Sequence, residues 1–205
     1  MDFNPSNPSN WDVEKDIKKS PLWPYVGGAA GLWKCPADNS SIVPALGPLR
    51  GKRVPRVRSI SMLIWLGGYG GRFDVGGLSD GLKSPPWRLY LGLNDLVEPG
   101  PTQTLLFCDQ REDSLSTPNF FIDMTGYPDK PSAVQFWADL PASYHHRAGG
   151  LSFADGHAQI KRWLDPRTML PVRKNSNWLF TSQRMPSPNN KDIVWLQERA
   201  TRRIR

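Results

Sequence analysis

All three histidines of the chain lie within thirteen consecutive residues, so this stretch is the first place to look for metal or acid–base chemistry. They are His145, His146 and His157. Imidazole is the commonest metal ligand among side chains, and it titrates near neutral pH. Asp155 stands between the histidines, and zinc accepts both imidazole and carboxylate ligands. One hypothesis is therefore a metal-dependent hydrolase that uses His145, Asp155 and His157.

Other features of the chain argue against catalysis. It has no His-Glu-x-x-His motif and no pair of histidines at helical spacing. Ser143 and Ser152 lie near the histidines but outside any Gly-x-Ser-x-Gly context. Asp109 and Asp139 are the further carboxylates that a metal centre could recruit. We expect a protein without enzyme activity.

The elements that must position the histidines begin with a hairpin. Asp155-Gly156 is typical of a two-residue type I′ turn, which needs positive φ at both positions. Pairing around this turn sets Ala154 opposite His157. Side chains alternate between the two faces of a strand. The predicted apolar face therefore consists of Leu151, Phe153, Ala158 and Ile160, and His157 is expected on the solvent side.

The rest of the pattern predicts an α+β fold. Strands are expected at 57–66, 104–109 and 119–123, and a final helix after Asn190. We expect an antiparallel sheet of three to five short strands, few short helices and long ordered loops. The chain is predicted to be a single domain over 1–205, with flexible ends at 1–10 and 197–205.

Composition limits the remaining functions. The net charge is +7, and part of the excess lies in a basic C-terminal tail, but no basic stripe is interleaved with aromatics, so we expect no nucleic-acid partner. Nine tryptophans keep a carbohydrate-binding module open as an alternative. Cys35 and Cys108 are too few for a disulfide framework, and unpaired thiols are favoured over a bridge. No apolar run is long enough for a membrane-spanning helix.

Several short motifs occur in one order along the chain. The first spacing is His145, nine residues, then Asp155-Gly156. The others are Cys35-Pro36-Ala37-Asp38, Arg58-Ser59-Ile60-Ser61-Met62, and the strand 104–109, which is followed by the charged turn Arg111-Glu112-Asp113. Together they resemble the bacterial prepilin-like family named for its H-X9-DG motif, which is related to the pseudopilins of type II secretion.

The resemblance implies a non-catalytic, pseudopilin-like head that serves filament subunit packing or contact with secreted cargo. Its partners would be other pseudopilin-like subunits or components of the protein secretion machinery. Family members begin with an apolar helix, and this chain opens without one. As written, the chain is expected to be soluble. It would be periplasmic or anchored in the inner membrane if such a helix precedes it.

The resemblance also implies a possible calcium site. Major pseudopilins of type II secretion bind calcium in a C-terminal loop, and Asn189, Asn190 and Asp192 lie in a similar segment. The competing interpretation makes Asn190 a helix cap and Asp192 a first-turn acid. The acidic stretch 109–113 is a second oxygen-rich candidate, for which the alternative is a turn closed by a salt bridge at Arg111.

Overall fold

The computed structural model describes residues 2, 4–74, 79–174 and 184–204. The strands are β1 (Ser41–Ile42), β2 (Val54–Pro55), β3 (Ile60–Leu63), β4 (Phe73–Asp74), β5 (Lys83–Ser84), β6 (Leu105–Asp109), β7 (Asn119–Phe120), β8 (Gln135–Trp137), β9 (Ala148–Phe153), β10 (Ala158–Arg162) and β11 (Arg184–Pro186). The α-helix within the described residues is α2 (Lys191–Gln197). Turns of 3₁₀ helix lie at Pro8–Asn10, Ile17–Lys19, Trp23–Tyr25, Ala30–Trp33, Asp80–Leu82, Leu93–Asp95, Pro131–Ala133 and Pro166–Thr168. These elements confirm the predicted α+β class, with few short helices and long connections.

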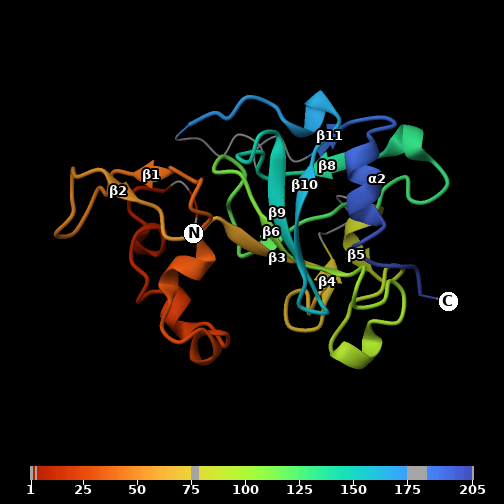
Figure 1. Ribbon diagram of the computed structural model, residues 1–205, viewed down its shortest axis with the longest axis horizontal. Helices are drawn as coiled ribbons and strands as arrows, with labels where there is room; N and C mark the ends of the chain where they lie inside the picture. The colour runs from red at the N-terminus through yellow and green to blue at the C-terminus, as the bar shows by residue number, and fades with distance from the viewer. Residues whose placement is uncertain (1, 3, 75–78, 175–183, 205) are drawn as a thin grey trace.

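A five-stranded sheet in the order β10-β9-β6-β3-β7 forms the centre of the molecule (Figure 1). The first three pairings in this order are antiparallel, whereas β7 runs parallel to β3. The predicted strand number is confirmed, but the sheet is mixed rather than wholly antiparallel. Three pairs of short strands complete the pairing, namely β1 with β2, β4 with β5, and β8 with β11.

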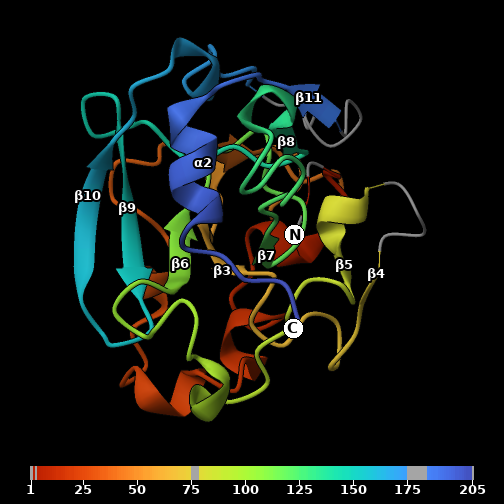
Figure 2. The ribbon, with the colours of Figure 1, turned by 90° about the vertical axis from the view of Figure 1, so that its right-hand side faces the viewer.

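The core lies on the sheet and beneath α2. Strand β6 is central, which explains its continuous apolar sequence, since both of its faces are covered. Helix α2 contributes Ile193 and Leu196 to the same buried cluster as Leu151 and Trp163. Figure 2 shows α2 lying against the part of the sheet formed by β6 and β9. The final helix predicted after Asn190 is therefore confirmed, and its apolar side chains face the core.

The hairpin of β9 and β10 is present, but its register differs by one residue from the predicted one. Ser152 pairs with Ala158 rather than with Gln159. The Gly156 N–H donates to the Phe153 carbonyl, and Gly156 has φ of 93°. Because only the glycine adopts positive φ, the connection is a three-residue loop with a bulge at Gly156 rather than a type I′ turn.

The shifted register changes which side chains are buried. Ile160 is 63% exposed and Ala158 is also exposed, so the predicted apolar face is wrong on β10. Leu151 and Phe153 of β9 are buried as expected. Strand β10 is the edge of the sheet, and few elements cover its side chains. His157 is exposed, as predicted, and its ring stacks on Phe153 at 4.3 Å between centroids.

The amino-terminal residues up to about 58 form a separate region at one side of the sheet, drawn red to orange in Figure 1. They contain four turns of 3₁₀ helix and the β1–β2 pair. Asn10 is fully buried, and its carbonyl accepts from the Val57 N–H at 3.1 Å. This region is therefore tied back to the sheet at the start of β3.

Described residues within both predicted flexible ends, 1–10 and 197–205, pack against the rest of the fold. At the amino-terminal end, Asn10 is fully buried, and its carbonyl accepts a hydrogen bond from the Val57 N–H. At the other end, Thr201 is also fully buried, and its hydroxyl donates to the Arg88 carbonyl. Arg199 lies over the Trp195 ring, with its guanidinium carbon 3.9 Å from the centroid. Much of the basic tail is thus used in packing.

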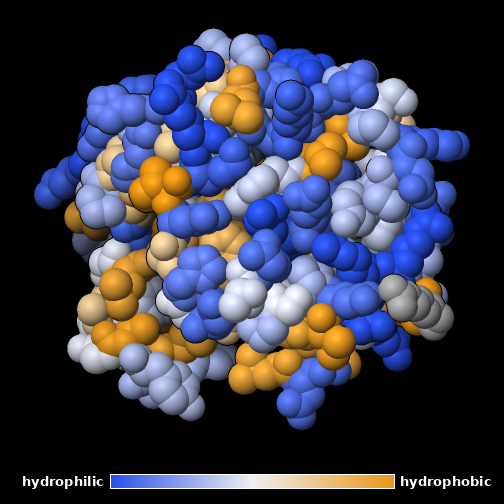
Figure 3. Space-filling model, turned by 45° about the vertical axis from the view of Figure 1, so that its right-hand side comes forward, coloured by the Kyte–Doolittle hydropathy of each residue, from blue (hydrophilic) through white to orange (hydrophobic). Residues whose placement is uncertain are grey.

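The surface is mostly hydrophilic, with hydrophobic side chains gathered in several separate areas of the face seen in Figure 3. Among the described tryptophans, four are buried and four are half-buried, and Trp178 lies outside the described residues. Within the part of the chain that the structure describes, no helix has the length and hydrophobicity needed to cross a membrane.

Candidate functional site

Three side chains from distant parts of the chain converge at the junction between the amino-terminal region and the sheet. They are Cys35, Asp109 at the end of β6, and His145 in the loop before β9. Their sulfur, carboxylate and imidazole ligand atoms all lie within 4.8 Å of one another. The Cys35 Sγ is 3.2 Å from His145 Nε2, which is 4.0 Å from Asp109 Oδ2.

A tight turn after a 3₁₀ helix positions Cys35. The Asp38 N–H donates to the Cys35 carbonyl at 3.0 Å and closes the turn that contains Pro36. The carboxylate of Asp38 is engaged in the turn itself, because it accepts from the backbone N–H and the hydroxyl of Ser40. In the Cys-Pro-x-Asp element, the cysteine therefore contributes its side chain to the site, and the aspartate stabilises the turn through its hydrogen bonds to Ser40.

A single serine fixes both the cysteine and the aspartate. The Cys35 N–H donates to Ser59 Oγ at 2.9 Å, and this hydroxyl donates to Asp109 Oδ1 at 2.9 Å. Ser59 is itself fully buried, and its backbone bonds to Trp33 and Gln110. The serine lies in the Arg-Ser-x-Ser-Met element, so a third motif takes part in building the site.

A strained turn positions His145. The next two residues, His146 and Arg147, have φ of 51° and 69°, a region that side chains with a Cβ rarely adopt. The His145 N–H donates to the Ala148 carbonyl, and the Arg147 carbonyl accepts from Trp163 N–H. Such conformations persist only where surrounding contacts enforce them, and they are concentrated at functional sites.

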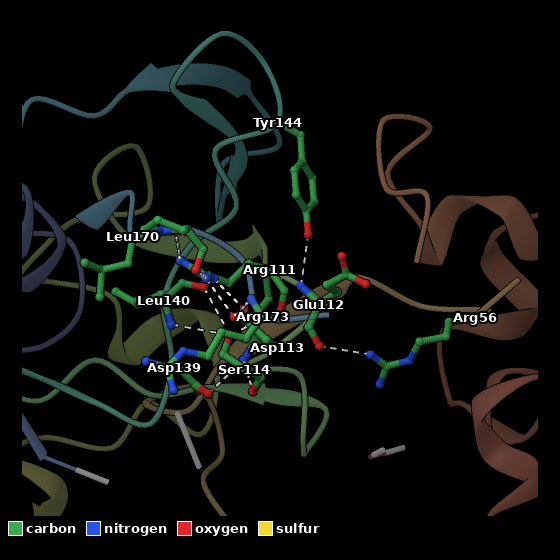
Figure 4. A network of polar contacts seen from close by, with 12 residues as sticks. Arg56, Arg111, Glu112, Asp113, Ser114, Asp139, Leu140, Tyr144, Leu170 and Arg173 are labelled. Carbon is green, nitrogen blue, oxygen red and sulfur yellow. Dashed lines mark hydrogen bonds and ion pairs between the residues drawn. The ribbon is translucent and has the colours of Figure 1, made fainter. Parts of the chain in front are cut away.

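The loop that follows Asp109 is braced from two sides, as Figure 4 shows. Arg56, from the amino-terminal region, donates to the Glu112 carbonyl at 3.0 Å. The Glu112 N–H donates to the hydroxyl of Tyr144, the neighbour of His145, at 2.9 Å. These two contacts connect all three regions that supply the site.

The same loop settles how the acidic stretch 109–113 is built. The Arg111 guanidinium bonds both carboxylate oxygens of Asp113, and both side chains are buried. Arg111 also donates to the carbonyls of Leu170 and Pro171. The oxygen-rich stretch is therefore a salt-bridged turn, the alternative to a calcium loop.

Burial dominates the electrostatics of the site. The Asp109 side chain is 1% exposed, and burial raises the pKa of its carboxyl to about 6, although the nearby Cys35 and Ser59 side chains favour the ionised form. Burial likewise raises the pKa of the Cys35 thiol to about 11. Asp109 Oδ2 accepts no hydrogen bond from the described residues. One buried carboxylate oxygen thus faces the thiol and the imidazole without a donor.

The arrangement differs from that of a catalytic triad. In a triad, the base nitrogen takes the proton of the nucleophile while the carboxylate holds the opposite ring nitrogen. Here, Cys35 and Asp109 both approach the same atom, His145 Nε2. Ligand atoms that converge on one point are instead the geometry of a metal site. Cys35 and Cys108 are both free thiols.

The predicted group of His145, Asp155 and His157 is not assembled. The His157 Nδ1 pairs with Asp155 Oδ1 at 2.6 Å at the exposed tip of the hairpin. His145 precedes the start of β9 and His157 follows its end, so the two imidazoles lie at opposite ends of this strand. Gly156, the last residue of the H-X9-DG motif, adopts the positive φ that the connecting loop needs, and it has no side chain that could bind a metal. The hydrolase centre of the alternative hypothesis is therefore not formed by these three residues.

The candidate calcium residues form a capped helix start. The Asn190 side chain accepts from the N–H groups of Asp192 and Ile193, which makes Asn190 the cap of α2. The buried Asp192 carboxylate accepts from the Leu164 and Asp165 N–H groups. Asn189 is exposed, with φ of 60°. Backbone donors thus already occupy the side-chain oxygens of Asn190 and Asp192, which favours the helix-cap interpretation over a calcium loop.

Comparison of the chain with protein-family models, with curated proteins and with solved structures finds no match. The site must therefore be interpreted from its own geometry. Sequence reasoning named Cys35 and His145 as separate motif residues and Asp109 only as an outlying carboxylate. It missed Ser59 as the residue that joins them. One feature of the sequence could have indicated this role for Ser59. It lies near the start of the predicted strand 57–66, and Asp109 lies at the end of the predicted strand 104–109, so antiparallel pairing of the two strands would bring them together.

Proposed function

We propose that the chain is a non-catalytic, pseudopilin-like head that packs against other subunits of its own kind or against secretion components. Two motif elements of the resemblance, the Cys-Pro-x-Asp and H-X9-DG segments, supply Cys35 and His145 to one cluster at the junction of the amino-terminal region and the sheet. This supports a role for the motifs in holding the head together. A position facing a substrate would instead require a cleft at these residues.

The observation that carries the proposal is a concentration of exposed apolar side chains on the amino-terminal region. Exposed large hydrophobics of this region are Leu22, Tyr25, Leu32, Val43, Leu46 and Leu49. Tyr25 is 85% exposed and Leu32 is 63% exposed. The other exposed large hydrophobics of the described residues are spread over later parts of the chain. Exposed apolar side chains that lie close together are typical of protein–protein contact surfaces. A groove of about 620 Å³ lies beside it, with Trp11 and Leu46 in its lining.

Two alternative functions have less support. The residues of the metal-dependent hydrolase do not come together, because His145 and His157 lie at opposite ends of β9. The carbohydrate-binding module needs exposed aromatic rings, and no described tryptophan is fully exposed. The resemblance to pseudopilins therefore remains the basis on which a function is proposed.

Self-association tests the proposal directly. We expect the purified chain to associate with concentration in sedimentation velocity experiments. The double variant Tyr25→Ser and Leu32→Ser should shift the distribution towards the monomer. Leu164→Ser is the matched control, since Leu164 is 61% exposed but lies outside the amino-terminal region. A chain that stays monomeric at its highest soluble concentration, or equal effects of control and double variant, would contradict the proposed surface.

The location implied by this function can be tested separately. A pseudopilin-like head acts in the periplasm, joined to the inner membrane by an apolar helix. Reading the gene upstream of Met1 for an in-frame apolar segment tests this part of the proposal. Fractionation of cells that express the natural gene gives a second readout, with the protein expected in the membrane or periplasmic fraction.

A further inference from the structure

We infer that Cys35, Asp109 and His145 bind one zinc ion, or a transition-metal ion of similar chemistry, at the junction of the amino-terminal region and the sheet. The donor set decides the class of metal. Thiolate, imidazole and carboxylate are the ligands that zinc takes in proteins. Calcium and magnesium prefer sites made only of oxygen, so a site with sulfur and nitrogen disfavours them.

The spacing of the donor atoms suits a tetrahedral ion. Zinc bonds of about 2.0–2.3 Å place neighbouring ligand atoms roughly 3.3–3.7 Å apart. The Cys35 Sγ to His145 Nε2 distance is 3.2 Å, and the Nε2 to Asp109 Oδ2 distance is 4.0 Å. All three donor atoms lie within 4.8 Å of one another, so side-chain shifts on the order of an ångström would bring them to bonding distance from one ion.

An independent observation points to a missing cation. Asp109 is 1% exposed, and its Oδ1 is held by Ser59, yet its Oδ2 forms no hydrogen bond of ordinary geometry with the described residues and has the Cys35 thiol as its neighbouring donor group. A buried carboxylate oxygen without a partner is costly. A cation bound between the sulfur and the imidazole would compensate that charge and satisfy the oxygen.

The surroundings also prepare the ligands. Ser59 aligns Cys35 and Asp109 together, the kind of outer-shell contact that orients metal ligands. Cysteine binds as the thiolate, so metal binding releases the thiol proton to solvent. The backbone amides of Ala37 and Asp38 favour that thiolate. The His145 side chain is 34% exposed, which leaves the fourth ligand position open to water.

Cobalt substitution provides the direct test. The full chain is stripped of metal with a chelator under reducing conditions and titrated with Co²⁺, then with Zn²⁺. We expect one ion per chain, a thiolate-to-cobalt charge-transfer band in the near ultraviolet, and displacement of cobalt by zinc. Zinc should also raise the melting temperature, since it binds only the folded state.

Ligand variants and matched controls locate the site. Cys35→Ser, Asp109→Asn and His145→Gln should each weaken zinc binding by more than about tenfold, because even outer-shell changes can have that effect. The controls are Cys108→Ala, which removes the other thiol, and His157→Ala, which removes an exposed imidazole. Circular dichroism of each variant separates loss of the fold from loss of a ligand.

Each outcome decides the inference. The charge-transfer band in the unmutated chain, lost in Cys35→Ser and kept in Cys108→Ala, supports it without relying on the other variants. Absence of stoichiometric binding overturns it, as does binding that depends on His157 instead of Cys35. A monomeric chain that binds zinc would remove the proposed association surface and leave this inference intact.

Discussion

The thiol of Cys35 lies 3.2 Å from Nε2 of His145, although the two residues are 110 positions apart in the chain. Each belongs to a different short motif of the sequence. Asp109, from the central strand β6, faces both. Because Cys35 comes from the amino-terminal region and the other two residues come from the sheet and its loops, the site forms only when this region packs on the sheet. Loss of the site would therefore indicate that the region has separated from the sheet.

Replacing Asp109 should reveal the cost of its buried charge in the metal-free chain. Asp109→Asn keeps the oxygen that accepts from Ser59 and removes the negative charge. With chelator at pH 8, we expect the variant to exceed the parent in unfolding free energy by on the order of 1–3 kcal/mol. Denaturant unfolding of both proteins measures the difference.

The pH dependence of this difference has a definite sign. The folded pKa of Asp109, about 6, is raised above the unfolded value, so its contribution to stability is full at low pH and is lost as pH rises through about 6. The advantage of Asp109→Asn should therefore shrink from pH 8 to pH 5. In zinc, the advantage of the variant should shrink or reverse, because the parent binds the ion more tightly. A variant less stable than its parent at pH 8 in chelator would refute this account.

Gly156 should be required for its backbone conformation alone. Its φ is 93°, and no atom lies within 4 Å of a Cβ built at this position. Gly156→Ala should therefore cost about 1–2 kcal/mol through backbone strain. Gly150→Ala is the matched control, since Gly150 has the same free space without the positive φ. Equal melting temperatures for the two variants would remove the bulged loop as the explanation.

Asp192 should stabilise the fold independently of calcium. Asp192→Ala leaves the Leu164 and Asp165 N–H groups without their buried acceptor, which should cost on the order of 2–4 kcal/mol. We expect the same loss of melting temperature with and without millimolar calcium. Asn189→Gly, which preserves the positive φ, should be nearly neutral. Stabilisation of the parent by calcium that either variant abolishes would instead favour a calcium loop.

Local patterns in the sequence predicted the parts of the fold that depend on neighbouring residues. The apolar run of β6 indicated a central strand, and Asn190 indicated the start of a helix. The hairpin register could not be fixed in this way, because Asp-Gly suits both a two-residue turn and a bulged three-residue loop. Ile160 was therefore assigned to the wrong face.

The site itself depends on contacts that no local pattern contains. The alternative hypothesis of a hydrolase grouped His145 with Asp155 and His157, which are near in sequence, but the extended strand β9 carries those residues away from it. Its actual neighbours, Cys35 and Asp109, are brought together by long-range sheet pairing and by Ser59. The packing of Thr201 against Arg88 is likewise a tertiary contact, which explains why a charged tail was expected to be flexible.

X-ray absorption at the zinc edge of the zinc-loaded chain tests the central claim most directly. Our account predicts one sulfur ligand at about 2.3 Å, with the remaining ligands nitrogen or oxygen at about 2.0–2.2 Å. The sulfur shell should disappear in Cys35→Ser and persist in Cys108→Ala. A zinc environment made only of nitrogen and oxygen in the unmutated chain would contradict the assignment of Cys35, Asp109 and His145 as the metal site.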